Sequence, residues 1–358
     1  MNPKSKIPEP MKKPILLYLT TLALTALCGG AAAGQAAAQS APDMSKYILT
    51  PKPADTPRIN GARVFGVRPG SEFLYTIAAT GVRPMTFSAE GLPKGLKLDP
   101  ETGRITGRVT APGEYTVHLK AANAPGSCER NLKIVVGDEI ALTPPMGWNS
   151  WNCWARDVTQ EQVLSSARAM VESGLVNHGW TYINIDDGWQ GRRGGRYNAI
   201  QTNDKFPDMK ELSEQVHAMG LKLGIYSSPW IGTYAAHIGS YSDNPDGENQ
   251  WIKDGNHNEN FRYEKPGGNY WQDRKEMYRH GAYSFVEADA RQWADWQIDY
   301  LKYDWNPNDL YHVKEMHDAL RATDRDIVYS ISNSAPYADA PLWRSEERRV
   351  GKECPYRC

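Results

Sequence analysis

From Leu142 onward the sequence alternates strand-like runs with helix-like segments, and this alternation constrains the fold more than any other feature. The strand-like runs are "TYINIDDGW", "KLGIYSSP", "IDYLKYDW" and "DIVYSISNS", and "TPPMGWNSW" precedes them. We interpret segments 159–175, 209–221, 287–297 and 310–323 as helices. Such alternation predicts parallel β/α units, and polar residues at the strand ends favour a barrel. Five strands are predicted, whereas a closed barrel needs eight.

The first of these helices carries the clearest local signals. Thr159 and Gln162 have the spacing of a capping box, which satisfies backbone N–H groups at a helix start. A stripe with helical period follows and predicts the buried face; it consists of Val163, Ala167, Met170 and Val171.

Polar and aromatic residues stand where each predicted strand ends. In a β/α barrel these ends meet in one pocket, so the residues are candidates for a common site. They are Trp148 and Trp151, Asp186 and Asp187, Tyr226, Lys302 and Asp304, and Ser332 with Asn333. Taken singly, each has an ordinary alternative: Asp186 and Asp187 could cap a helix or solvate a loop, and Trp151 and Tyr226 could be core aromatics.

Lys302 and Asp304 raise a specific question, because they are two charges at the end of an apolar strand. Side chains of a strand alternate between its two faces, so Tyr300, Lys302 and Asp304 share one face and Leu301 and Tyr303 share the other. Two charges on one face of a buried strand are costly unless they pair with each other or take part in chemistry.

The segments "TPPMGWNSWNCW", "YINIDDGW", "LKLGIYSSP" and "IDYLKYDW" resemble the successive signature segments of glycoside hydrolase family 27, the α-galactosidases and α-N-acetylgalactosaminidases. The resemblance covers about residues 142–343. It implies a retaining hydrolase of terminal α-D-galactosyl residues built on a (β/α)8 TIM barrel. The alternatives left open are a related enzyme acting on α-N-acetylgalactosamine or β-L-arabinopyranose, and a non-catalytic galactose-binding protein.

The resemblance also assigns roles by position. Asp304 matches the catalytic nucleophile, and Lys302 beside it would favour the charged form of that carboxylate and could hydrogen-bond the sugar. Asp186 and Asp187 match the pair that accepts hydrogen bonds from the 4- and 6-hydroxyls. The remaining substrate-binding positions are Trp151 against the apolar face of the sugar, Tyr226 lining the pocket, and Ser332.

The sequence departs from the family pattern in three places. Gly188 stands where eukaryotic members carry a cysteine, and Ser332 stands where animal galactosidases place a glutamate near the sugar 2-position. The segment that would hold the acid/base, similar to "WNDPDM", is not found. We therefore expect the 358-residue chain to be inactive, as a truncated barrel spanning 140–343. Residues 344–358, "RSEERRVGKECPYRC", resemble translated sequencing-adapter DNA and are interpreted as a non-native tail.

Residues 63–138 predict an immunoglobulin-like antiparallel β-sandwich, because short strands alternate there with Gly- and Pro-containing turns. This part resembles the immunoglobulin-like modules of secreted bacterial carbohydrate enzymes. A Pro-rich linker is expected at 41–62 and a signal peptide at 1–40, where a basic start is followed by a short apolar stretch. Export is the expected localisation, and a lipid anchor at Cys28 is not favoured. Cys128 and Cys153 are expected to be free thiols.

Composition excludes some partners. Lys and Arg total 41 against 42 Asp and Glu, so the net charge of −1 favours neither nucleic acid nor an acidic membrane surface. No membrane span and no cofactor are expected. No metal site is expected either, because the eight histidines show no ligand spacing and His217, His312 and His317 are predicted on helix surfaces. The insertion at about 230–285 could be a lid or subsite wall, although a self-packed surface loop is favoured. The oligomeric state is left open.

Overall fold

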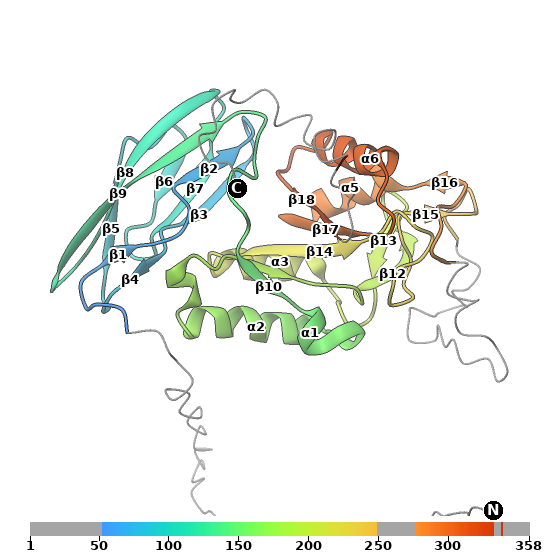
Figure 1. The fold of residues 1–358 in the computed structure, drawn as a ribbon, viewed down its shortest axis with the longest axis horizontal. Helices are drawn as coiled ribbons and strands as arrows, with labels where there is room; N and C mark the ends of the chain where they lie inside the picture. Colours follow the sequence, from blue (N-terminus) through green and yellow to red (C-terminus); the bar gives the residue numbers. More distant parts are fainter. Residues whose placement is uncertain (1–51, 249–276, 333–337, 339–358) are drawn as a thin grey trace, which may run out of the picture. The chain divides into compact units, whose positions relative to one another are not determined.

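The structure, a computed structural model, describes residues 52–248, 277–332 and 338 (Figure 1). The predicted signal peptide and the predicted tail lie outside these residues. Within the described ranges, no helix combines the length and the apolar character that crossing a membrane requires. The two cysteines in these ranges, Cys128 and Cys153, are both free, as the sequence predicted.

The N-terminal part is a β-sandwich of two sheets that enclose one apolar core. The four-stranded sheet has the order β2-β9-β8-β5, with β2 (Val64–Val67), β5 (Thr86–Glu90), β8 (Gly113–Asn123) and β9 (Gly126–Val136). The three-stranded sheet has the order β3-β7-β6, with β3 (Glu72–Thr76), β6 (Leu96–Leu98) and β7 (Arg104–Arg108). Strands β1 (Arg58–Ile59) and β4 (Ala79–Thr80) form a separate antiparallel pair.

One pairing in the sandwich differs from the all-antiparallel prediction. Strand β2 lies parallel to β9, with Val64 opposite Lys133 and Val67 opposite Val136. These two strands are the first and last of the two sheets along the chain, so the domain closes by bringing its two ends side by side. Short-range alternation and turn signals could not reveal this, because they report hairpins between neighbouring strands.

The C-terminal part is a half-barrel whose five strands are all parallel. Their order is β10 (Gly147–Asn149), β11 (Tyr182–Asn184), β14 (Lys222–Ser227), β17 (Tyr300–Asp304) and β18 (Val328–Ser332). Spatial order therefore equals sequence order, as in a singly wound barrel. The five strands are those that the sequence predicted. Two antiparallel pairs are added: the hairpin of β12 (Gln190–Gly194) with β13 (Ala199–Thr202), and the pair of β15 (Tyr241–Ser242) with β16 (Tyr283–Ser284), which are distant in the sequence.

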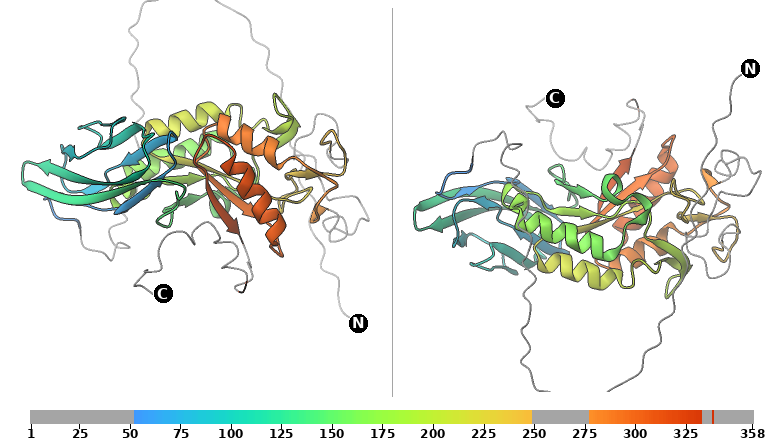
Figure 2. Two further views of the ribbon diagram at one scale, coloured as in Figure 1. Left: turned by 90° about the horizontal axis from the view of Figure 1, so that it is seen from above. Right: turned by 90° about the horizontal axis from the view of Figure 1, so that it is seen from below.

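Helices connect the strands and pack on one face of this sheet. They are α1 (Trp151–Trp154), η2 (Ala155–Asp157), α2 (Gln160–Glu172), η3 (Leu175–His178), α3 (Met209–Ala218), α5 (Val286–Asp295) and α6 (Leu310–Arg321). Helices α2 and α3 lie side by side, as do α5 and α6 (Figure 2). The predicted capping box is present, since Gln162 N–H donates to Thr159 Oγ1 and Thr159 N–H donates to Gln162 Oε1.

The predicted stripe on α2 is correct except at its last position. Val163, Ala167 and Met170 are buried in the core, but Val171 is 37% exposed and Leu164 is buried instead. The helical period does not separate these two residues, because positions 164 and 171 are two turns apart and lie about 20° from each other around the helix. Val171 is the penultimate residue of α2, whereas Leu164 lies within its first two turns.

The strand register places the predicted site residues on the inner face of the half-barrel. Leu301 and Tyr303 are fully buried in the core on the helix side. Tyr226 lies opposite Lys302 and Asp304 lies opposite Ser332 in neighbouring parallel strands. Residues in register across parallel strands point to the same face, so these four side chains share the face away from the helices. This confirms the alternation predicted for strand 300–304.

A buried ion cluster fixes the opposite ends of the strands. Asp299, just before β17, accepts hydrogen bonds from the Leu223 backbone N–H and from Arg325 Nη2, and its Oδ2 lies 2.7 Å from His217 Nε2. The predicted surface placement of His217 is therefore wrong, since its side chain is only 17% exposed and faces a carboxylate. Burial opposes the charge on Asp299, but Arg325, His217 and Lys222 outweigh it and lower the pKa of Asp299 to about 2.

The β-sandwich is bonded to the half-barrel through Arg68. Its backbone N–H and its Nε donate to the two oxygens of Asp326, at 2.9 and 2.6 Å, and its two Nη atoms donate to the carbonyls of Arg321 and Arg325. Ser71 Oγ adds a bond of 2.9 Å to Asp326. An arginine that donates to a carboxylate and to two carbonyls is held in one geometry, so this contact is specific.

We expect Asp299 to make the fold sensitive to acid. Its folded pKa lies below the value of about 3.9 for an unfolded Asp, so its ionised form stabilises the fold above about pH 4. That contribution, on the order of 2 kcal/mol, should be lost as the pH falls from about 4 to about 2. Asp299→Asn should therefore be less stable than the native chain at pH 7 and lose less further stability on acidification, measured by urea unfolding at a series of pH values.

Asp324→Asn is the matched control, because Asp324 is an exposed carboxyl near the same strand end. The unfolding free energy of this variant should follow that of the native chain at every pH. If the native chain and Asp299→Asn lost stability in parallel between pH 5 and pH 2, the role assigned to Asp299 would be wrong.

Candidate active site

Lys302 lies among the carboxylates at the C-terminal ends of the strands. Its Nζ donates to Asp186 Oδ2 at 2.8 Å and lies 3.7 Å from Asp304 Oδ2. The same Nζ lies 5.1 Å from the centre of the Tyr226 ring, within the range of a cation–π contact. The structure thus brings together four of the seven predicted site residues through one ammonium group.

Asp186 is held by a network that starts in the first strand. Asn149 Nδ2 donates to Asp186 Oδ2 at 2.8 Å, and Ser150 Oγ accepts from the Asp186 backbone N–H at 2.9 Å. Asp186 and Ser150 are almost fully buried. Sequence reasoning missed Asn149 and Ser150, although both belong to the "GWNSW" segment that drew attention to Trp148 and Trp151.

Asp187 is held by a segment that the sequence analysis assigned to the insertion. Thr233 Oγ1 donates to Asp187 Oδ1 at 2.8 Å and the Ala235 backbone N–H donates to Asp187 Oδ2 at 2.7 Å. His237 Nδ1 lies 3.2 Å from Asp187 Oδ1. Asp187, Thr233 and His237 are each at most 2% exposed. Both oxygens of Asp187 are therefore fixed in direction by donors from one short turn.

Asp304 is buried beside these carboxylates, with 5% of its surface exposed. Burial raises the pKa of Asp304, and the charges of Asp186 and Asp187 raise it further. Lys302 and the Tyr226 hydroxyl act in the opposite direction without cancelling the rise. Lys302 thus lowers the pKa of Asp304, as the sequence predicted, but burial raises this pKa by more than Lys302 lowers it.

Aromatic rings from the insertion form a wall next to Asp304. Trp230 stacks on Tyr278 with ring centres 4.9 Å apart, and Tyr234 contacts both rings. Burial and then the charge of Asp304 raise the pKa of Tyr234 to about 12, which places this tyrosine within the field of the carboxylate. These rings were not among the predicted site residues. Trp230 directly follows the strand-like run "KLGIYSSP" but was assigned to the insertion, and Tyr234 and Tyr278 lie within the insertion.

The described beginning of the insertion is therefore not a self-packed surface loop. Residues 230–242 are buried apart from Tyr234, and they contact Asp187 as well as the aromatic wall. The alternative of a subsite wall fits this part of the chain. Four further aromatic residues of the insertion, Trp251, Tyr263, Tyr270 and Trp271, lie outside the described residues.

The structure places Trp151 and Ser332 at the margins of this cluster. Trp151 begins α1, its backbone N–H donates to Asn149 Oδ1, and its side chain contributes to a residue exposure of 38%. Ser332 ends β18 in register with Asp304 and is half-buried. Ser332 is thus beside Asp304 in the sheet, whereas Trp151 is linked to Asp186 only through Asn149, and the roles assigned to these two residues stay predictions.

Gly188 follows the acidic pair in a conformation that requires glycine. Its φ is +132°, and a Cβ there would lie 2.8 Å from the Arg156 carbonyl oxygen. A side chain would therefore be strained by the backbone angle and blocked by the Arg156 main chain. The local backbone therefore accounts for a glycine at the position where the eukaryotic pattern has a cysteine.

The histidines on α6 also need correction. His312 was predicted on a helix surface without ligand spacing, but its side chain is 13% exposed and its Nδ1 lies 2.8 Å from both oxygens of Asp309. His280, from the end of the insertion, is stacked on it with ring centres 3.4 Å apart. A spacing search along α6 could not find His280, which is 32 residues away in the sequence.

Comparison with known proteins places these features in a family. A family model described as "Alpha galactosidase A" matches residues 143–256 and 270–356, and one described as "Putative Ig domain" matches residues 56–137. The curated "Alpha-galactosidase A" of Cellvibrio japonicus is 36% identical over 202 residues, which is 54% of this chain and 39% of that protein. The curated "Probable alpha-galactosidase" of Dictyostelium discoideum is 33% identical over 201 residues, which is 54% of this chain and 40% of that protein.

Two crystal structures from Bacteroides fragilis are also similar. One, titled as a "putative alpha-galactosidase", is 39% identical with a TM-score of 0.62, and the match covers 76% of this chain and 51% of that chain. The other, titled as a "putative alpha-galactosidase/melibiase", is 38% identical with a TM-score of 0.65, covering 81% and 55%. The chain thus spans from about two fifths to just over half the length of these relatives. Because the first family model covers more than half of the 358 residues, the chain belongs to the alpha-galactosidase A family that its strand-end motifs resemble.

Proposed function

We propose that this chain carries the nucleophile and the sugar-binding groups of a retaining α-galactosidase that acts on terminal α-D-galactosyl residues of glycans. The observation that carries the proposal is the placement of Asp304 beside Lys302 and Asp186 at the strand ends of a half-barrel. The named relatives and the family membership support the same reaction class.

In this reaction Asp304 attacks the anomeric carbon of the bound sugar. The new bond joins a carboxylate oxygen to C1, the bond from C1 to the leaving oxygen breaks, and water later hydrolyses the glycosyl-enzyme. Only the ionised carboxylate is nucleophilic. Lys302 supports that form by lowering the pKa of Asp304 against the effect of burial.

The neighbouring groups suit recognition of an axial 4-hydroxyl. Asp186 and Asp187 are fixed by donors, so their remaining lone pairs have set directions and can accept from the 4- and 6-hydroxyls. Lys302 Nζ can donate to a third sugar oxygen. In this proposal the Trp151 ring covers the apolar face of the sugar, Tyr226 lines the pocket, and Ser332 lies toward the 2-substituent.

The second half of the reaction needs a general acid and base. Retaining enzymes place that second carboxyl roughly 5 Å from the nucleophile. Within residues 52–248 and 277–332, the carboxylates whose charges raise the pKa of Asp304 are Asp186 and Asp187. Both already accept hydrogen bonds, Asp186 from Lys302 and Asn149 and Asp187 from Thr233 and Ala235. We therefore propose that the described residues bind the sugar and supply the nucleophile, and that they do not complete a turnover by themselves.

An activated substrate separates the attack by Asp304 from the steps that need the general acid and base. A 5-fluoro-α-D-galactosyl fluoride loses fluoride without protonation, so Asp304 alone should form the C1–oxygen bond while the ring fluorine slows its hydrolysis. We expect intact mass spectrometry of the 358-residue chain to show one added glycosyl group. Mass spectrometry of a proteolytic digest should locate this group on the peptide that contains Asp304. The same chain should release no nitrophenol from 4-nitrophenyl α-D-galactoside at steady state.

Asp304→Asn should not be labelled, whereas Asp324→Asn, which changes an exposed carboxyl, should be labelled like the native chain. Labelling by the α-N-acetylgalactosaminyl or the β-L-arabinopyranosyl fluoride, and not by the galactosyl fluoride, would select the related substrate instead. Galactose binding seen by saturation-transfer NMR without any labelling would favour the non-catalytic galactose-binding protein. Steady nitrophenol release would contradict the proposed lack of turnover.

The charge of Lys302 should control the protonation of Asp304. Lys302→Met keeps most of the side-chain volume and removes the ammonium group, so the pKa of Asp304 should rise further above its ordinary value. Carbon-13 NMR titration of the Asp304 carboxyl in the two proteins measures this directly. Lys314→Met, on an exposed lysine of α6, should leave the titration unchanged, and an equal titration in Lys302→Met would show that the two groups are not coupled.

We also propose that the protein is exported. The support is the composition of residues 1–40, where Lys12 and Lys13 precede an apolar stretch of a length typical of signal peptides and a run of small residues follows.

A further inference from the structure

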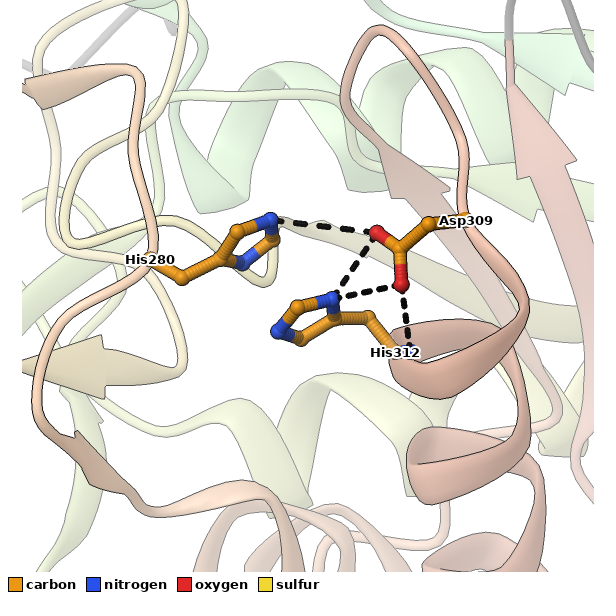
Figure 3. Close-up of side chains that lie close together, drawn as sticks. All are labelled: His280, Asp309 and His312. Atoms are coloured by element: carbon orange, nitrogen blue, oxygen red, sulfur yellow. Dashed lines mark hydrogen bonds and ion pairs between the residues drawn. The ribbon is translucent and has the colours of Figure 1, made fainter.

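We propose that His280, Asp309 and His312 form a binding site for a divalent transition-metal ion, with Zn²⁺ as the preferred ion (Figure 3). One donor atom from each of the three residues lies within 4.8 Å of the others. The residues come from two segments: His280 lies near the end of the insertion, Asp309 is the N-cap of α6, and His312 lies in the first turn of that helix. This site uses none of the residues assigned to sugar binding.

The distances are close to those of a coordination shell. His312 Nδ1 lies 2.8 Å from the Asp309 oxygens, and His280 Nε2 lies 3.8 Å from Asp309 Oδ2. Two ligands of a tetrahedral Zn²⁺, each about 2.0–2.1 Å from the ion, are about 3.3 Å apart. These two separations lie on either side of this value, and all three donor atoms lie within 4.8 Å of one another, so the three donors are grouped near a point that one ion could occupy.

The surroundings of His280 indicate which of its nitrogens faces Asp309 without a proton. His280 Nδ1 lies 3.1 Å from the Pro229 carbonyl oxygen, which can only accept, so Nδ1 carries the hydrogen. In the neutral ring Nε2 then presents a lone pair toward the Asp309 carboxylate. Two electron-pair donors that face each other are unfavourable unless a cation lies between them. A carbonyl that fixes the tautomer of a histidine is also the usual support of a metal ligand.

Asp309 is supported in the same way. Trp305 Nε1 donates to Asp309 Oδ2 at 3.3 Å, and the His312 backbone N–H donates to Asp309 Oδ1 at 3.0 Å. The carboxylate is therefore oriented before any ion arrives. The side chains of Asp309 and His280 are 40% and 32% exposed, so water can complete the shell. Two imidazole nitrogens and one carboxylate oxygen form a donor set typical of Zn²⁺.

Binding would change the packing of the two rings. The two rings are stacked with an angle of 7° between their planes, and a lone pair lies in the plane of its ring. A shared ion therefore requires the rings to tilt apart at the edge that faces Asp309. The bound ion would join the segment of Tyr278 and His280 to the connection between β17 and α6, five residues after Asp304, and so hold the aromatic wall in place.

The test is a titration of the full 358-residue chain, made without a histidine tag and stripped with a chelator. Co²⁺ serves as the probe, because tetrahedral Co²⁺ has strong visible bands, and Zn²⁺ should displace it. We expect one equivalent to bind, and His280→Asn to weaken binding at least tenfold. Zn²⁺ should also raise the thermal unfolding midpoint of the native chain and not that of His280→Asn.

His317→Asn is the matched control, because His317 lies on the same helix and outside the cluster. It should bind Co²⁺ as the native chain does. Blocking the cysteines with iodoacetamide should leave the binding unchanged, and the bands should lack thiolate charge transfer. Equal binding by His280→Asn, loss of binding after cysteine blocking, or no binding at all would each overturn the proposal. None of these readouts depends on glycosidase activity.

Discussion

Asp186, Asp187 and Asp304 are three carboxylates buried within one end of the half-barrel, and Lys302 is the cation that lies among them. Buried carboxylates are tolerated only where ion pairs or hydrogen bonds compensate for the lost hydration. Lys302 compensates Asp186 directly and Asp304 at longer range, while Asp187 depends on the neutral donors Thr233 and Ala235. The three carboxylates are thus held from three places: the strand that carries Lys302, the Asn149–Ser150 segment at the end of the first strand, and one turn from the insertion.

The part of this arrangement that depends on local periodicity could be predicted from the sequence. Alternation along strand 300–304 places Lys302 and Asp304 on one face, and the capping box at Thr159 and Gln162 marks a helix start. Parallel strands in sequence order then bring the strand ends together. This topology is sufficient to predict that Asp186, Tyr226 and Asp304 lie close to one another. The family resemblance added the roles of these residues.

The contacts that could not be predicted are those between segments with no periodic signal. Thr233 and His237 lie in an irregular stretch 46 to 50 residues after Asp187, and His280 lies beyond a further long stretch. Loops satisfy their polar groups through contacts that depend on the three-dimensional path of the chain, and composition does not encode that path. The default expectation for an insertion is a surface loop, and the turn at 233–237 departs from it because this turn contacts Asp187 and is buried apart from Tyr234.

The raised pKa of Asp304 connects sugar recognition with the proposed chemistry. Part of the rise comes from the charges of Asp186 and Asp187, which oppose a third negative charge nearby. If these two carboxylates accept hydrogen bonds from sugar hydroxyls, as proposed, each donor reduces their electrostatic effect on Asp304. The pKa of Asp304 then falls when the sugar binds, which favours the ionised, nucleophilic form of the carboxylate. By linkage the ionised state of Asp304 must bind the sugar more tightly than the protonated state, so the same two carboxylates would select galactose and activate the group that attacks it.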